Sequence, residues 1–278
     1  MLKIVPQEVW AFDAEWVPDP QSGRRVYGLP ASLDDDAVIQ HMWKKGGATE
    51  EDPQPYLKTV LCRVVSIASV IRKQAKDGSI SLKLHSLPMP GAMDATEADI
   101  ISRFLTALGK AKPQLVGYNS QSSDIIILMQ RSLANSLYLP DFCKRPAKPW
   151  EGVDYFARGS DYNIDLKEEF GGWGKATPSL HELATVCRIP GKIGTDGQDV
   201  VELWMKGNIG RIVQYNECDA LTTYLVWLRA ALMAGQLTTE NFLKEEGQLE
   251  NMLREKAESP ENDHLRHYLE VWQELRSA

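Results

Sequence analysis

The order of hydrophobic and polar positions predicts several strands in the first half of the chain. Residues 9–16 have the pattern of a first strand, and residues 61–72 are dense in valine and isoleucine, as a buried strand is. Residues 79–87 alternate apolar and polar positions, and an aspartate-glycine pair just before them is a hairpin signal. Residues 114–118 form a further short strand. The prolines at residues 17–20 are expected to end the pairing of the first strand.

Helical spacing dominates the second half. A helix is already predicted in the first half, over residues 96–108, with Thr96 as its N-cap and Gly109 as its end. Residues 21–56 are polar and are predicted to be irregular, apart from a short helix over residues 34–42. Further helices are predicted over residues 123–132, 178–187, 200–206, 209–233 and 238–256, before a last helix with Leu265, Leu269, Trp272 and Leu275 on one face. This order of elements predicts an α/β protein with a mixed sheet.

Composition and charge narrow the class of protein only slightly. With 278 residues, 43% hydrophobic and 25% charged, the chain has the composition of a soluble globular protein. No apolar run approaches the ~20 residues that cross a bilayer, so no membrane association is expected. The formal net charge of −7 argues against a protein that coats nucleic acid, although metal-binding carboxylates would contribute negative charge of this kind.

The cysteines and the absence of an apolar stretch near residue 1 predict a cytoplasmic protein. Cysteines occur at four scattered positions without a C-x-x-C pair, which favours reduced thiols over disulfides or a zinc site. We expect one domain over residues 1–235. Residues 236–278 are expected to form a helical extension packed on the same domain.

The first acidic motif lies at the end of the first predicted strand. Asp13 and Glu15 are two positions apart, so they point to one face, while Phe12 and Ala14 point to the other. Two carboxylates this close repel each other unless a cation lies between them. Taken alone, however, this is a weak signal, because a solvated strand end explains most such pairs.

Two further acidic motifs follow later in the chain. Asp124 begins the helix after the strand at residues 114–118, where a first-turn or capping role also explains it. Tyr215 and Asp219 are four positions apart in a helix and share one face, so the phenol could orient a water on a metal that Asp219 binds. An ordinary amphipathic helix is the alternative. Oxygen ligands of this kind suit Mg²⁺ or Mn²⁺, and together they indicate a metal-dependent nuclease.

The motifs taken in order resemble those of a known superfamily. Phe12-Asp13-Ala14-Glu15, then Asn119 with Asp124 five positions later, then Tyr215-x-x-x-Asp219 are similar to the motifs of the DEDD superfamily of 3′–5′ exonucleases, in its tyrosine type, DEDDy. The similarity is to the predicted exonucleases related to the proofreading exonuclease domain of family B DNA polymerases. It extends over residues 8–232 and includes the segments 163–166, 179–184, 189–192 and 199–204.

This resemblance implies a ribonuclease H-like fold: a mixed five-stranded sheet with the first three strands antiparallel, flanked by helices, with extra C-terminal helices. It implies two divalent cations, Mg²⁺ or Mn²⁺. Asp13, Glu15 and Asp219 would hold one ion with the attacking water, and Asp13 with Asp124 would hold the other. Tyr215 would position the water. The implied reaction removes nucleoside 5′-monophosphates one at a time from the 3′ end of single-stranded nucleic acid, and we expect DNA rather than RNA.

Several other positions are candidates for substrate contact or support. Trp16 replaces a small residue of the family and could stack on a terminal base, although a half-buried loop aromatic explains it equally well. Further candidates for substrate contact are Phe12, Ala14 and Asn119. Candidates for a supporting or capping role are Asp165 and Asp199, whereas His264 and His267 are expected to face solvent. The rival hypothesis is a catalytically inactive ribonuclease H-like module that binds nucleic acid or a protein partner.

Overall fold

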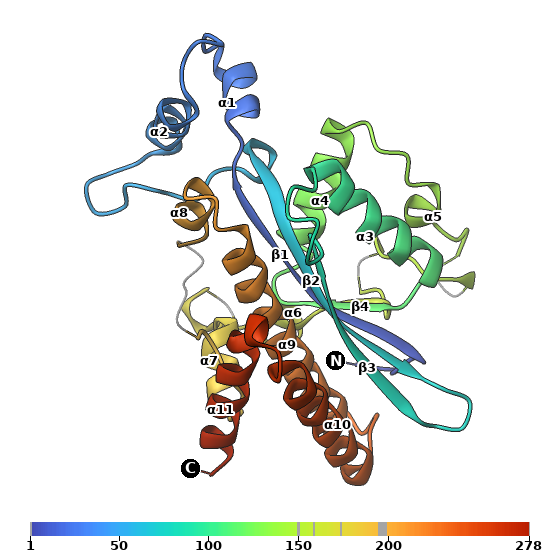
Figure 1. The fold of residues 1–278 in the computed structure, drawn as a ribbon. Helices are drawn as coiled ribbons and strands as arrows, with labels where there is room; N and C mark the ends of the chain where they lie inside the picture. Colours follow the sequence, from blue (N-terminus) through green and yellow to red (C-terminus); the bar gives the residue numbers. More distant parts are fainter. Residues whose placement is uncertain (1, 149–150, 158, 173, 194–198, 278) are drawn as a thin grey trace.

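A mixed five-stranded sheet with the strand order β3-β2-β1-β4-β5 lies at the centre of the fold. The computed structural model describes residues 2–148, 151–157, 159–172, 174–193 and 199–277 (Figure 1). The strands are β1 (Glu8–Pro18), β2 (Cys62–Gln74), β3 (Ile80–Leu87), β4 (Gln114–Gly117) and β5 (Asn163–Asp165). Strands β1 to β3 pair antiparallel, whereas β4 is parallel to β1 and β5 is parallel to β4. The predicted ribonuclease H-like sheet is confirmed.

Helices cover both faces of this sheet. They are α1 (Pro20–Tyr27), α2 (Asp35–Gly46), α3 (Glu97–Ala111), α4 (Asp124–Ala134), α5 (Pro140–Cys143), α6 (Leu166–Phe170), α7 (Leu180–Val186), α8 (Asp199–Met205), α9 (Ile209–Met233), α10 (Thr239–Ala257) and α11 (Asp263–Ser277). Short 3₁₀ turns span Thr59–Leu61, Gly174–Ala176 and Pro260–Asn262. Figure 1 shows α3, α4 and α5 on one side of the sheet and α9, α10 and α11 on the other. Among the described residues, no helix has the length and apolar character needed to cross a bilayer.

The alternation of side chains along β1 decides what each face of the sheet contacts. Trp10, Phe12 and Ala14 are buried in the core formed with α3 and α4, where Phe12 stacks on the ring of Phe104. Val9 and Ala11 are buried on the opposite face, in the core that α9 forms. Because strand positions alternate, the odd-numbered acids that follow Ala11 must also lie on the α9 side.

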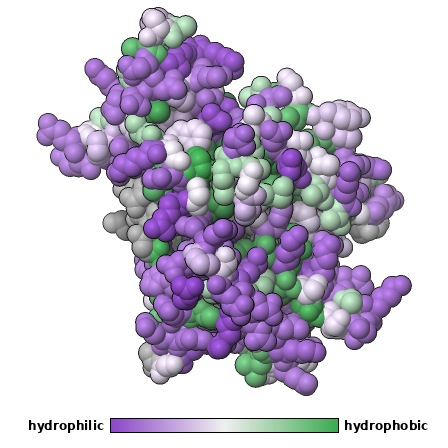
Figure 2. All heavy atoms as spheres, in the orientation of Figure 1, coloured by the Kyte–Doolittle hydropathy of each residue, from purple (hydrophilic) through white to green (hydrophobic). Residues whose placement is uncertain are grey.

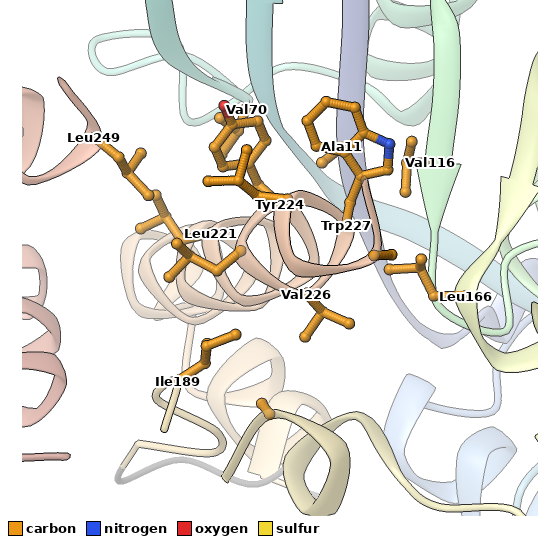
Figure 3. Close-up of a cluster of buried hydrophobic side chains, with 14 of the residues drawn as sticks. Ala11, Val70, Val116, Leu166, Ile189, Leu221, Tyr224, Val226, Trp227 and Leu249 are labelled. Atoms are coloured by element: carbon orange, nitrogen blue, oxygen red, sulfur yellow. The ribbon is translucent and has the colours of Figure 1, made fainter. Parts of the chain in front are cut away.

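Helix α9 is the central element of that second face. Tyr224 and Trp227 are fully buried on it and pack against Ala11, Val70 and Val116 of three neighbouring strands (Figure 3). Helices α10 and α11 pack on the outer side of α9 and contribute to the same core.

Three predictions about element boundaries are wrong, each for a local physical reason. Strand β1 continues to Pro18, which lies opposite Cys62 at the last pair, where a proline is tolerated. The segment at residues 21–56 is not irregular at its start, because Asp19 accepts a hydrogen bond from the backbone N–H of Gln21 and so caps α1. Helix α3 continues past Gly109 to Ala111, and the glycine serves packing instead of ending the helix, because a side chain there would collide with the backbone of α5.

The predicted thiols and the predicted N-cap at Thr96 agree with the structure. Thr96 and Ser179 each cap a helix with the reciprocal bonds of a capping box. All four cysteines are free, as predicted: Cys62 and Cys218 are buried, Cys187 is half-buried and Cys143 is exposed. The predicted cytoplasmic location stays a prediction.

Candidate active site

Three carboxylates meet where the end of β1 faces the first half of α9. Asp13, Glu15 and Asp219 each offer one oxygen atom, and these three atoms lie within 4.8 Å of one another. All three side chains are half-buried. The structure therefore brings together the first and third acidic motifs, which are about 200 residues apart in the sequence. A cluster of this kind can hold a divalent cation.

The elements around this cluster explain why it forms. Asp13 and Glu15 continue the α9-facing side of β1, and Asp219 lies on the part of α9 that crosses that strand. A β-bulge in the pairing with β2 falls directly after Glu15, a position at which bulges often accompany active sites. Tyr215 lies one helical turn before Asp219 and packs with Val17 of β1. It is only 9% exposed.

Asp124 reaches the site from the other edge of β1. Strand β4 pairs with β1 only as far as Ala11, which leaves the backbone N–H of Ala14 free of strand pairing on that edge. The carboxylate of Asp124, at the start of α4, accepts a hydrogen bond from this N–H at 3.1 Å. Asp124 is 3% exposed. Its carboxylate is thus directed to the acid-bearing strand, which a purely local cap on α4 would not require.

Burial raises the pKa of Asp13, Glu15 and Asp124, and repulsion between the acids adds to the shift of the first two. The pKa of Asp13 lies well above its usual range because the group is buried and faces the charges of Asp124, Glu15 and Asp219. The pKa of Glu15 is raised by the same two effects. Burial raises the pKa of Asp124 to about 7. A bound cation would remove this repulsion, so the donor set fits a hard divalent metal.

This pKa shift predicts a pH-dependent stability in the absence of metal. Because the folded pKa of Asp124 (about 7) exceeds its unfolded value near 3.8, its carboxyl costs stability progressively as pH rises from about 4 to about 7. Asp124→Asn keeps the acceptor for Ala14 but cannot ionise. In EDTA, the Tm of Asp124→Asn should therefore exceed that of the wild type by a margin that grows as the pH rises from about 4 to about 7. Added Mn²⁺ should stabilise the wild type at pH 8. A Tm difference that stays constant with pH would contradict the prediction.

Asp165 supports the loop that carries Asp124. It ends β5, and its carboxylate accepts hydrogen bonds from the backbone N–H groups of Asn119 at 2.7 Å and Gln121 at 3.0 Å. It also caps α6 by accepting from the N–H of Lys167 at 3.0 Å. The predicted supporting role of Asp165 is confirmed. The side chain of Asp199, the other candidate for such a role, is outside the described part of the chain.

The four candidates for substrate contact have different surroundings. The side chains of Phe12 and Ala14 are buried in the core beneath the sheet, so any contact from them would come from the backbone. Asn119 has a left-handed backbone with φ 62°, and its side chain bonds Lys167 and Ser123 within the loop. Trp16 is half-buried and lines a cavity beyond Glu15.

A connection between α9, β3 and α11 was not anticipated. Glu217 lies between the two residues of the third motif and accepts a hydrogen bond from Ser86 Oγ at 2.6 Å. Its other oxygen lies 2.7 Å from His264 Nε2. The prediction that His264 faces solvent is wrong, because its side chain is 10% exposed, whereas that of His267 is 58% exposed as expected. Helical spacing alone placed both histidines on the polar face and gave no signal for a partner 47 positions away.

Fold and site together define a ribonuclease H-like exonuclease with an acidic cluster at the end of β1. Residues 54–272 match the family described as predicted 3′–5′ exonucleases related to the exonuclease domain of PolB. The match covers most of the chain, and the chain belongs to this family. The matched region includes Asp124, Tyr215 and Asp219. Strand β1, which carries Asp13 and Glu15, lies before the matched region. A comparison with curated proteins finds no match.

Proposed function

We propose that the chain is a tyrosine-type (DEDDy) 3′–5′ exonuclease that removes nucleoside 5′-monophosphates from the 3′ end of single-stranded nucleic acid, DNA rather than RNA. The observation that carries this proposal is the meeting of Asp13, Glu15 and Asp219 within 4.8 Å, in a chain of this exonuclease family. A half-buried cluster of like charges is costly, and a catalytic metal site gives it a physical reason.

Each acid has a distinct role in the proposed site. Asp13, Glu15 and Asp219 would hold one Mg²⁺ or Mn²⁺ ion, and Asp13 with Asp124 would hold a second. When bound, such ions lower the pKa of a water and stabilise charge on the leaving oxygen. The acids also keep the site negative until the cations arrive, which favours cation binding over binding of a bare phosphate.

Tyr215 contributes a protonated hydroxyl in this proposal. Burial and the neighbouring charge of Asp219 raise the pKa of its phenol, so it stays protonated throughout the physiological range. A protonated hydroxyl beside the acidic cluster can hold the attacking water by donating to it or accepting from it. No proton transfer to Tyr215 is required.

The proposed domain organisation has support from the packing. We propose that residues 236–278 are an extension of the domain formed by residues 1–235. The buried ion pair between Arg72 of β2 and Glu245 of α10 supports this, with two N–O distances of 2.8 Å. Thr222 of α9 and Tyr268 of α11 form a second buried contact, at 3.0 Å.

Labelled oligonucleotides test the proposed reaction directly. Single-stranded DNA and RNA with a 5′ label are incubated with Mg²⁺, Mn²⁺ or EDTA, and released products are identified by chromatography. We expect a ladder that shortens from the 3′ end, nucleoside 5′-monophosphates as products, and no reaction in EDTA. Internal cleavage, or degradation that persists in EDTA, would contradict the proposal. Binding that is unchanged in EDTA, with no nucleotide release in Mn²⁺, would instead favour an inactive binding module.

Tyr215→Phe provides a finer test of the site. Loss of the hydroxyl removes water positioning but no metal ligand, so kcat should fall by about 100-fold. The affinity for Mn²⁺, measured by titration calorimetry, should change little. Tyr155→Phe is the matched control, because Tyr155 is equally buried but its hydroxyl bonds Pro113 on the other side of the sheet. A kcat that is equal in the two variants would exclude a role for the Tyr215 hydroxyl.

A further inference from the structure

Three buried charged residues meet where the end of β1 adjoins α3 and α4. The guanidinium of Arg131, on α4, donates to Glu97 of α3 at 2.7 and 2.8 Å and to Asp19 at 2.9 Å. Asp19 directly follows β1, and the three residues are only 5% to 7% exposed. We call them the Arg131 clamp. They belong to none of the three acidic motifs, and the proposed reaction assigns them no part.

The clamp and Asp124 lie on the same face of α4. Asp124 and Arg131 are seven positions apart, which is two turns of an α-helix, so their side chains project to the same side. At one end, Asp124 accepts the hydrogen bond from the backbone N–H of Ala14. At the other end, Arg131 bonds Asp19, five residues further along the same segment. Helix α4 is thus attached to this segment at two points, and only the first of them is a candidate metal ligand.

Glu97 links the guanidinium to the neighbouring strand. One of its oxygens accepts from the backbone N–H of Val64 in β2 at 2.8 Å, and Val64 pairs with Trp16 of β1. The other oxygen accepts from Asn135, just after α4, at 2.9 Å. With the two bonds from Arg131, each oxygen of Glu97 has two donors. A buried charge with this many partners stays in one arrangement, since breaking it would leave an unpaired charge in the core.

The clamp also holds the start of the arm formed by α1 and α2. This arm lies beyond the end of β1 (Figure 1), and Figure 2 shows mostly hydrophilic residues on it. Ser22, in the first turn of α1, donates to Asp19 at 2.6 Å and accepts from Arg131 at 2.9 Å. The end of β1, the start of the arm and α4 are therefore joined through one guanidinium.

A fixed α4 matters because Asp124 is its first residue. Burial and then the charge of Asp124 are the largest causes of the raised pKa of Asp13, so the two carboxylates lie close together. The apolar contacts of α4 with the core are non-directional. An arginine fork paired with a carboxylate, by contrast, sets an orientation. The clamp therefore decides how α4 presents its first residue to β1.

We propose that Arg131 is a positioning residue: it fixes α4 against the end of β1 and so places Asp124 opposite Asp13 for the second divalent cation. This proposal rests on the proposed function, in which those two acids hold that ion. Arg131 lies two helical turns from Asp124, so it acts through α4 and not by contact with the ion.

Arg131→Lys tests the placement of Asp124 without any metal. Lysine keeps the buried positive charge, but its single ammonium cannot form the fork. In EDTA, the NMR amide resonance of Ala14, in protein labelled with ¹⁵N-alanine, reports the hydrogen bond to Asp124. We expect this resonance to move toward its position in Asp124→Ala. Arg72→Lys is the matched control, because Arg72 is another buried arginine with two bonds to a glutamate, Glu245, and it should leave the resonance in place.

Mn²⁺ binding tests the consequence for the metal site. Electron paramagnetic resonance counts the bound ions, and a coupled pair of Mn²⁺ ions has its own spectrum. In Arg131→Lys the affinity for the second Mn²⁺ should fall about 10- to 100-fold, the usual effect of losing a residue that orients a ligand, while the first ion binds as in the wild type. A higher Mn²⁺ concentration should then restore kcat. Arg72→Lys should bind both ions like the wild type.

Each failure has a distinct signature. If the wild type binds two ions, and Arg131→Lys has the wild-type Ala14 resonance and the wild-type affinity for both, the positioning role is wrong. If the wild type binds one Mn²⁺ ion only, the two-ion site of the proposed function is wrong and this proposal falls with it. Should Arg131→Lys fail to fold, Glu97→Gln takes its place in both measurements, because it keeps an acceptor for Val64 but removes the charge that orients the guanidinium.

Discussion

Asp13→Asn should lower kcat by on the order of a thousandfold or more, because a catalytic metal supplies several kcal/mol of charge stabilisation and each 1.36 kcal/mol is tenfold in rate. Asp13 is the acid that the proposal assigns to both ions. Asparagine keeps the size of the side chain but removes the charge that binds the cation. The measurement is single-turnover hydrolysis of 5′-labelled single-stranded DNA in saturating Mn²⁺.

Two controls separate this effect from misfolding. Asp36→Asn removes an exposed carboxylate on α2 that belongs to none of the three acidic motifs. This variant should retain wild-type kcat. Asp13→Asn should also unfold at a higher temperature than the wild type in EDTA at pH 8, since it removes one member of a repelling cluster. Full activity in Asp13→Asn would refute the proposed metal site.

Glu245→Ala should destabilise the protein by about 3–5 kcal/mol, the usual effect of leaving one charge of a buried ion pair without its partner. Arg72 is 1% exposed and Glu245 is 2% exposed, and their two N–O contacts are both 2.8 Å. Tyr224 also donates to Glu245, at 3.1 Å. Urea denaturation measures the change in the free energy of unfolding, provided that the variant and the wild type have the same m-value.

The double variant Arg72→Met/Glu245→Met is the matched control. It fills the same space without charge, so its stability should return to near that of the wild type. Glu202→Ala, which removes an exposed partner of Lys206, should change the stability very little, because solvent screens such a pair. If Glu245→Ala were as mild as Glu202→Ala, the C-terminal helices would not depend on this ion pair for their attachment.

The sequence predicted most strands and helices because their signals are local. Alternation along β1 follows from residue order alone, so it already placed Asp13 and Glu15 on one face. The N-cap of α3 at Thr96 was predicted, because the capping contact joins residues only three positions apart. Helix α1 was missed because its main signals, a capping Asp19 and a first-position Pro20, were taken as those of a loop.

The candidate site was only partly visible in the sequence. The five residues of the three motifs could be named from their order and spacing, and Asp165 could be named as a supporting residue. Nothing local indicated that His264 would meet Glu217, because that contact depends on how α11 packs across α9. The cavity that Trp16 lines has the same origin, since it joins Trp16 and Pro18 to residues 43–57 and to α8.

By itself, then, the sequence determined the class of the fold, the periodic faces of its elements and the identity of the acids. The periodic faces depend on neighbours within a few positions, where helical and strand periodicity act. The acids could be named because three separated motifs, taken in order, resemble those of the DEDD superfamily. Only the tertiary structure decided which acids meet, how burial and repulsion raise their pKa values, and what lies beside them. Burial and charge proximity are set by the packing of distant segments, which no local pattern encodes.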